Sequence, residues 1–196
     1  MVAGFVRRSG GTELQNGHEK QNFGEPLGDF SLRDLRGNTV SLSQSLEGKK
    51  GAVVVFWSSI CSHCVRYGEY LGSFESLHPE LALLVVASRH GETVADINKA
   101  VTEQKLRFKI LHDPGGKVAK EWHTQQTPRA YLMDSNRALI YRGAIDNYQY
   151  KDTALYVGYL EPAISQFLAG EPLEKPKTAS FGCAIQSVYY ILPKAL

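Results

Sequence analysis

The chain has 196 residues and a formal net charge of +2, with 43% hydrophobic and 21% charged residues. This composition is typical of a globular domain that buries a core, and the absence of any basic cluster excludes nucleic acid as an indicated partner. Because no apolar run approaches the roughly 18–20 residues of a membrane helix, we also expect no membrane span.

We divide the chain into three parts by composition. Residues 1–24 are polar and Gly-rich and predict a flexible N-terminal segment, residues 25–170 predict one folded domain, and residues 171–196 predict a tail that docks on it. The N-terminus has no apolar stretch after its arginines and does not match a signal peptide. We therefore expect a cytoplasmic protein as the chain stands, and an exported or periplasmic one if a leader is missing.

The first half of the chain alternates strands and helices. "DFSL" and "TVSL" predict a hairpin that turns at Arg36-Gly37-Asn38, and "AVVVFW" predicts a central strand buried on both faces. Apolar residues near helical spacing predict a helix over 62–78, and "LALLVVAS" predicts a second buried strand. A helix over 93–104 follows, with Thr93 and Asp96 placed as a capping box.

The second half ends in a hairpin and a helix. "RFKILHD" predicts a short strand, and a brief helix follows the turn "DPGG". "AYLMD" and "ALIYRG" flank a turn at Ser135-Asn136, and the last helix is predicted over 153–168, where Pro162 either kinks it or starts a new segment. The alternation predicts an α/β fold: a central mixed sheet with a parallel portion, helices on both faces and an N-terminal β-hairpin extension.

The cysteine pair in "FWSSICSHC" lies where the central strand passes into a helix. There, backbone N–H groups and the helix dipole favour a thiolate at Cys61, while Cys64 lies one turn further on, within reach for a disulfide. A structural zinc site normally needs four ligands, often supplied by two such pairs, and there is no second pair. We therefore interpret the pair as a redox centre and expect no metal and no cofactor.

These residues resemble the thioredoxin superfamily, through "FWSSICSHC" and the later "TPRAYLMD". The further stretches "LHDPGGKVAKEW", "LIYRGAIDN" and "FGCAI" resemble redoxins of the thiol-specific-antioxidant type. The resemblance implies a thioredoxin-like fold, a cis Pro128 against the sulfur of Cys61, and a Thr127 backbone that pairs with an extended substrate. It also implies that Trp57 shields the disulfide.

The chain departs from these families at the usual proton acceptors for the second cysteine. Many thioredoxins carry a buried Asp at the position of Val55, and extracytoplasmic reductases often carry a Glu at the position of Tyr67. Water is then the default acceptor for the proton of Cys64. Relatives of the subgroup also tend to have Pro where this chain has Val65.

Two further residues are candidates for redox roles. His63 precedes the second cysteine, an arrangement that resembles strong periplasmic disulfide oxidases; by stabilising the Cys61 thiolate it would make the disulfide more oxidising. The alternative is a helix-start histidine without redox effect. Cys183 is either a third redox thiol that forms a mixed disulfide with the pair or a buried, inert cysteine, and we favour inert packing.

The predicted function is a thiol–disulfide oxidoreductase in which Cys61 attacks and Cys64 resolves, with protein or small-molecule thiols and disulfides as partners. A monomer is favoured. One alternative is a peroxidase of the peroxiredoxin type, whose PxxxTxxC pattern falls here on Val54 and Ser58. Another is a copper- or zinc-handling protein of the same fold that is not an enzyme.

Overall fold

A computed structural model describes residues 22–149, 151 and 153–186. The expected flexible segment over 1–24 lies outside the described residues except for its last three, and the end of the expected tail, 187–196, lies outside them as well. In the described part, no helix combines the length and the apolar character needed to cross a membrane.

The described residues form a seven-stranded mixed sheet in the order β2-β1-β5-β4-β3-β7-β8. The central strands β3, β4 and β5 run parallel, and the others pair antiparallel. The strands are β1 (Ser31–Asp34), β2 (Thr39–Ser41), β3 (Gly51–Trp57), β4 (Leu81–Ala87), β5 (Ile110–His112), β7 (Arg129–Asp134) and β8 (Leu139–Gly143). The mixed sheet and both predicted hairpins are thereby confirmed.

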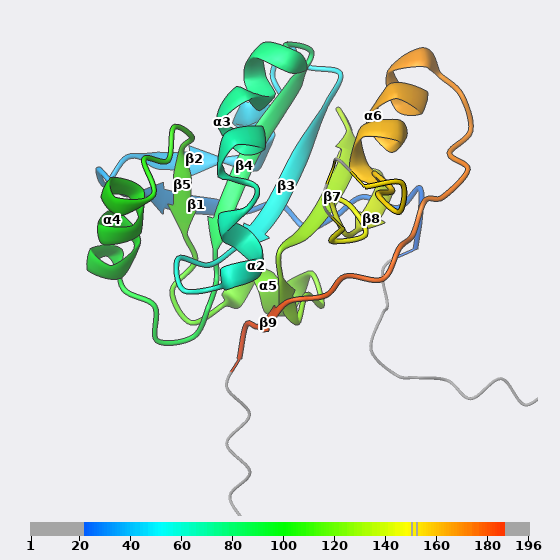
Figure 1. Ribbon diagram of the computed structural model, residues 1–196. Coiled ribbons are helices and arrows are strands. Elements are labelled where there is room, and N and C mark those ends of the chain that lie inside the picture. The colour runs from blue at the N-terminus through cyan, green and yellow to red at the C-terminus, as the bar shows by residue number, and fades with distance from the viewer. Residues whose placement is uncertain (1–21, 150, 152, 187–196) are drawn as a thin grey trace, which may run out of the picture.

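Helices cover both faces of this sheet, as the alternation of elements predicts (Figure 1). One face packs against α3 (Gly68–Leu77), α4 (Val94–Glu103) and α6 (Leu160–Ala169). The other packs against α1 (Leu42–Ser45) and α5 (Lys117–Glu121). The predicted capping box of Thr93 and Asp96 is present at the start of α4.

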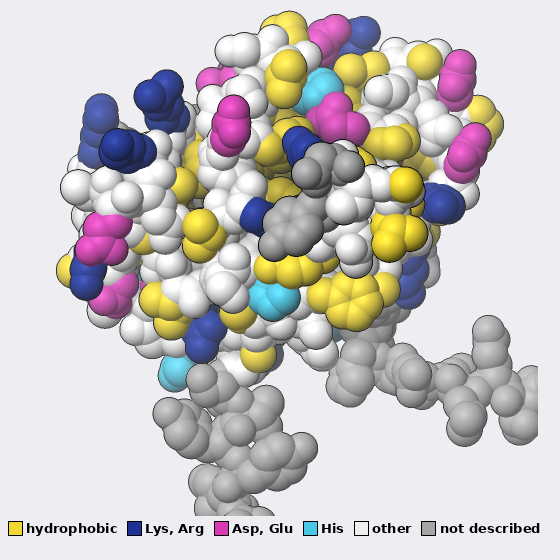
Figure 2. All heavy atoms as spheres, in the orientation of Figure 1, with side chains coloured by type: hydrophobic (Ala, Val, Ile, Leu, Met, Phe, Trp, Pro, Cys, Tyr) yellow, Lys and Arg dark blue, Asp and Glu magenta, His cyan; other side chains and the backbone are white. Residues whose placement is uncertain are grey.

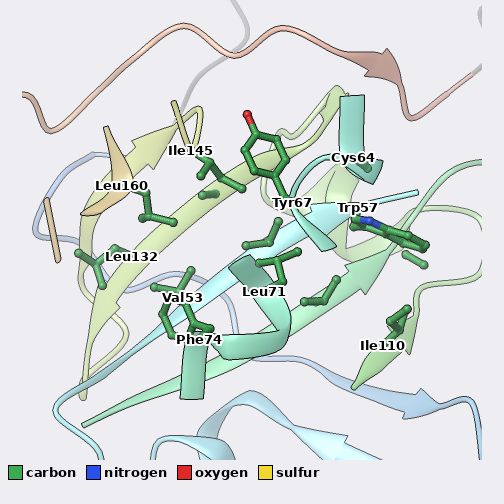
Figure 3. Close-up of a cluster of buried hydrophobic side chains, with 14 of the residues drawn as sticks. Val53, Trp57, Cys64, Tyr67, Leu71, Phe74, Ile110, Leu132, Ile145 and Leu160 are labelled. Atoms are coloured by element: carbon green, nitrogen blue, oxygen red, sulfur yellow. The ribbon is translucent and has the colours of Figure 1, made fainter. Parts of the chain in front are cut away.

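Strand β3 lies in the centre of the sheet and contributes to both layers of core. Val53, Val55 and Trp57 point into the cluster beneath α3, and the alternate residues of the strand point to the opposite face. Every residue of β3 is buried, which explains its continuous apolar sequence. Figure 3 shows the first cluster, where Leu71 and Phe74 of α3 pack over β3 and Cys64 lies at its edge.

Two predicted helices differ from the observed ones. The single helix expected over 62–78 is divided into α2 (Ser62–Val65) and α3, because Arg66 and Tyr67 interrupt it just before Gly68. The last helix begins at Leu160 and not at 153, which places Pro162 in its first turn, where a missing N–H is tolerated. Gly170 ends it in a left-handed conformation with φ 71°.

Two short strands in the second half were not predicted. They are β6 (Gln126–Thr127) and β9 (Cys183–Ala184), which pair antiparallel and form a separate two-stranded sheet. Figure 1 shows the chain after α6 running along the outside of β8 and then beneath the sheet to β9, close to α2 and α5. This pairing brings the C-terminal part of the described chain to the cysteine pair.

The core beneath α3 gives a prediction about stability. Leu71 is 2% exposed and Leu77 of the same helix is 57% exposed. Leu71→Ala should lower the free energy of unfolding by about 2–5 kcal/mol, because it opens a cavity against β3. Leu77→Ala is the matched control and should change it by less than about 0.5 kcal/mol. Urea denaturation checks both, and equal losses would contradict the described packing of α3.

Candidate active site

Cys61 lies where β3 ends and α2 begins, as expected from the sequence. It is the N-cap residue of α2, and its carbonyl oxygen accepts a hydrogen bond from the N–H of Cys64 at 2.8 Å. Its Sγ atom lies 3.2 Å from the carbonyl oxygen of Thr127. The side chain has no exposed surface, so this sulfur is enclosed on all sides.

Cys64 and Trp57 lie behind Cys61 in the core. Both are buried in the cluster between the sheet and α3 (Figure 3). The ring of Trp57 packs edge-on against Phe108, with 6.3 Å between the ring centroids. Trp57 belongs to the same buried cluster as both cysteines, and its role as a shield of the disulfide stays a prediction. All three cysteines of the chain are free thiols.

Thr127 and Pro128 form the opposite wall of the site. Their peptide bond is cis, as the resemblance implied, and both residues are buried. The backbone of Thr127 was expected to face an extended substrate. In the structure it is paired instead with Cys183 of β9, in an antiparallel register that also sets Gln126 against Ala184.

Cys183 is thereby brought to the sulfur of Cys61. It is half-buried and hydrogen-bonds to Cys61 through both its thiol and its backbone N–H. The favoured interpretation of Cys183 as a buried packing residue did not anticipate this position. No local signal in "FGCAI" indicates it, because the contact joins residues more than a hundred positions apart.

The surrounding thiols favour a negative charge on Cys61. A hydrogen bond from the thiol of Cys64, followed by those from Cys183 and Thr127, lowers the pKa of Cys61 to about 4 despite its burial. Backbone N–H groups at the helix start and the helix dipole were expected to have this effect. Since α2 is a single turn, neighbouring hydrogen-bond donors account for the thiolate instead.

The other two thiols are held in their protonated form. Burial, and then the adjacent Cys61 thiolate, raise the pKa of Cys64 far above its usual range. The same two causes raise the pKa of Cys183, opposed by the positive charge of Arg89 and by the backbone N–H of His63. The site therefore holds one thiolate and two thiols that donate to it.

His63 packs on an aromatic ring. It lies 4.5 Å from the ring centre of Tyr148, and the two planes are tilted by 41°. Its Nδ1 atom is buried and has no hydrogen-bond partner among the described residues. Its backbone N–H, and not its ring, is the group that reaches the sulfur of Cys183.

Two carboxylates near the site were not predicted. Glu92 is 8% exposed and its Oε1 atom accepts hydrogen bonds from the backbone N–H of Ser59 at 2.5 Å and from the hydroxyls of Ser58 and Ser59. It thus holds the loop that leads into Cys61. Its position after β4 was a usable signal, because parallel strands end at the same edge of a sheet.

The second carboxylate is Asp146. It is 2% exposed and accepts a hydrogen bond of 2.7 Å from the hydroxyl of Tyr67, the residue that stands where related reductases carry Glu. Arg66 lies 3.7 Å from the other oxygen of Asp146. Among the described residues, no group of three or more His, Cys, Asp or Glu side chains is arranged to hold a metal ion.

Comparison with known proteins places this geometry in a family. The model of the AhpC/TSA family matches residues 23–142, more than half of the chain. The chain belongs to the AhpC/TSA family. It is 30% identical over 113 residues to a thioredoxin-like protein of Haemophilus influenzae. The aligned residues cover 58% of this chain and 65% of that protein, slightly less than two thirds of its length.

Other relatives agree with this assignment. The chain is 25% identical over 122 residues to the thiol-disulfide oxidoreductase ResA of Bacillus thuringiensis, covering 62% of this chain and 69% of that protein. The crystal structure of a hypothetical protein from Sinorhizobium meliloti superposes with a TM-score of 0.74 at 26% identity, over 86% of this chain and 96% of the other. The fold is thioredoxin-like, and relatives of the chain are thiol–disulfide oxidoreductases.

The lowered pKa of Cys61 gives a prediction about pH. The thiolate absorbance of the reduced protein should persist as the pH falls below about 8.5, the usual thiol pKa, and should disappear only near pH 4. The stabilisation that this thiolate gives the reduced fold is complete above about pH 8.5 and is lost as the pH falls through the folded-state pKa. Ultraviolet titration measures this, and Cys61→Ser should lack the acidic step.

Proposed function

We propose that this protein is a thiol–disulfide oxidoreductase in which Cys61 is the nucleophile and Cys64 a resolving thiol. The observation that carries the proposal is the arrangement of Cys61, whose sulfur is hydrogen-bonded by the Cys64 thiol and has a lowered pKa. A thiolate is the attacking species in disulfide exchange, so this is the sulfur best prepared to react.

The reaction follows from the two positions in α2. The Cys61 thiolate attacks one sulfur of a substrate disulfide, forms a mixed disulfide and releases the other substrate sulfur as a thiolate. Cys64 then loses its proton to water and attacks Cys61, which releases the second substrate thiol and leaves a Cys61–Cys64 disulfide. The substrate is reduced by two electrons and the pair is oxidised by two; the reverse direction uses the same steps.

A protein chain is the partner that the surroundings favour. Large apolar side chains are exposed around the cysteine pair and the C-terminal strand: Ile60 63%, Val65 47%, Tyr148 38% and Phe181 65%. Figure 2 shows hydrophobic side chains interspersed with polar, charged and histidine side chains on the face that carries α2, and several Lys and Arg side chains gathered at its upper left. Such an apolar surface suits contact with another protein.

The proposed poise is oxidising. Groups that stabilise the Cys61 thiolate stabilise the reduced protein, which raises the reduction potential of the disulfide. The lowered pKa of Cys61 supports this direction. His63 is proposed to contribute to this poise: its ring packs against Tyr148 at the start of α2, and its backbone N–H reaches the sulfur of Cys183.

The roles of the cysteines are testable by turnover. Cys61→Ser should reduce insulin reduction in the presence of dithiothreitol to the background rate of the reductant, since no other thiol of the site is ionised. The exposed neighbour Ser62 provides the control, and Ser62→Ala should retain turnover. If Cys61→Ser keeps the activity of the unchanged protein, the proposed nucleophile is wrong.

The poise is testable by redox titration against glutathione. We expect a potential nearer to about −120 mV than to about −270 mV, the values of a strong oxidant and of thioredoxin. His63→Ala should shift it towards reducing values by tens of millivolts, where about 30 mV corresponds to about 1.4 kcal/mol. Val65→Ala, on the same turn, should not. An unchanged potential in His63→Ala would remove the histidine from the proposal.

Peroxidase activity is the other candidate, because the sequence also resembles redoxins of the thiol-specific-antioxidant type, to which peroxiredoxins are related. Its sequence pattern would need Pro at Val54 and Thr at Ser58. Val54 points to the sheet face opposite Cys61, and the Ser58 hydroxyl donates to Glu92 at 3.3 Å. We therefore expect stopped-flow consumption of hydrogen peroxide no faster than that of free cysteine. A rate far above that value would establish peroxidase function instead.

A further inference from the structure

The segment around β9 is fastened to the wall of the active site by its backbone. The N–H of Ile185 donates to the carbonyl of Gln125 at 2.9 Å, and the carbonyl of Ile185 accepts from the N–H of His90 at 2.8 Å. The side chain of Ile185 is 1% exposed and lies in the core on the α5 side of the sheet. This anchor fixes the chain just after Cys183.

The chain before Cys183 is fastened as well. The N–H of Arg142 donates to the carbonyl of Pro176 at 3.0 Å, and the Thr178 hydroxyl lies 2.7 Å from that of Tyr141. Gly182 then passes directly over Thr127, so closely that a Cβ atom at this position would lie 1.9 Å from the Thr127 carbonyl oxygen. The close approach requires glycine, and Cys183 is thus held from both sides.

Held in this way, Cys183 covers the nucleophile. It is opposite Thr127 in the register of the two strands, and Thr127 is the residue whose carbonyl lies 3.2 Å from the Cys61 sulfur. The thiol and the N–H of Cys183 both hydrogen-bond to Cys61, which has no exposed surface. Because Cys61 has no exposed surface, access of a substrate disulfide to its sulfur requires movement of the chain around it, and β9 is part of that chain.

We propose that Cys183 is a second resolving thiol, which β9 delivers to a mixed disulfide on Cys61. The proposal rests on the nucleophilic role of Cys61 proposed above. In this proposal β9 takes part in the disulfide exchange, and the reactive site contains three thiols, those of Cys61, Cys64 and Cys183.

The exchange is balanced at each step. Cys183 loses its proton to solvent and its thiolate attacks the Cys61 sulfur of the mixed disulfide, so that a Cys61–Cys183 bond forms and the substrate sulfur leaves as a thiolate. Cys64 next loses its proton to solvent and its thiolate attacks Cys61, which forms the Cys61–Cys64 disulfide and releases Cys183 as a thiolate that takes up a proton from solvent. The substrate disulfide is the oxidant: its two sulfurs have left as thiolates, reduced by two electrons, once the Cys61–Cys183 disulfide has formed. The later exchange of Cys183 for Cys64 takes place within the protein and transfers no net electrons.

The surroundings of the two resolving thiols differ. Cys64 is fully buried, whereas Cys183 is half-buried and can release a proton to water. Once Cys61 is in a disulfide, its negative charge no longer opposes ionisation of either thiol. Burial remains the main influence that raises the pKa of each thiol, and on Cys183 it is opposed by the charge of Arg89 and by the N–H of His63, which lower its pKa.

The experiment isolates Cys183 by removing Cys64. Reduced Cys64→Ser protein is treated with glutathione disulfide and followed by intact mass, thiol counting and peptide mapping. We expect the glutathione adduct to decay in a first-order process that is independent of protein concentration, leaving a Cys61–Cys183 linked peptide. A persistent adduct on Cys61 would overturn the proposal and leave the nucleophilic role of Cys61 intact.

The matched control is the double variant Cys64→Ser/Cys183→Ser. It should keep the glutathione adduct on Cys61, because neither nearby thiol remains. If neither variant gains an adduct or an internal disulfide, the proposed function itself fails, which distinguishes the two proposals.

A third variant tests delivery by the strand. Cys64→Ser/Gly182→Ala retains Cys183 but places a methyl group against the Thr127 carbonyl, so β9 should dock poorly and the adduct should persist several-fold longer. Formation of the internal disulfide at the rate of Cys64→Ser would show that docking of β9 is not required and would overturn that part of the proposal.

Discussion

The site depends on the contact between the Cys61 sulfur and the carbonyl of Thr127, 3.2 Å away. This contact joins the N-cap of α2, which follows the central strand β3, to the end of β6, and both residues are buried. The position of the Cys61 sulfur is set by the packing of β3. Because β3 is entirely buried, it cannot shift without opening the core, and the first turn of α2 therefore starts at a fixed place.

Of the three sulfurs in the site, one carries a negative charge and two are protonated, and each state depends on the others. A thiolate at Cys61 is stabilised because Cys64 and Cys183 remain protonated and donate to it, and the same thiolate raises the pKa of both. The charge would cost far more on Cys64, where burial is the largest influence on the pKa and raises it. Forming a disulfide at Cys61 removes the charge and releases its neighbours from this constraint, so the chemistry of the first step prepares the second.

The sequence was informative where the determinants are local. The cysteine pair after "AVVVFW", the capping box at Thr93 and the hairpins could all be predicted, because each depends on neighbouring residues and on the period of the apolar pattern. The interruption at Arg66 and Tyr67 could not, since apolar spacing continues across it and tertiary contacts of Tyr67 with Asp146 accompany it. The positions of Glu92 and Cys183 depend on strand ends and on a tail that meet only in the folded chain.

The C-terminal strand also changes what access to the site requires. An extended partner that pairs with the backbone of Thr127 must take the place of Cys183, because one strand edge accommodates one neighbour. In the proposed mechanism, binding of a protein substrate and docking of this strand compete, and the apparent affinity for substrate falls in proportion to the fraction of molecules in which the strand is undocked. In the same proposal, the residue that occupies the place of the substrate carries a thiol. When β9 returns after the first exchange, it therefore places the nucleophile Cys183 at the mixed disulfide. Closure of the site and release of the product then become the same movement.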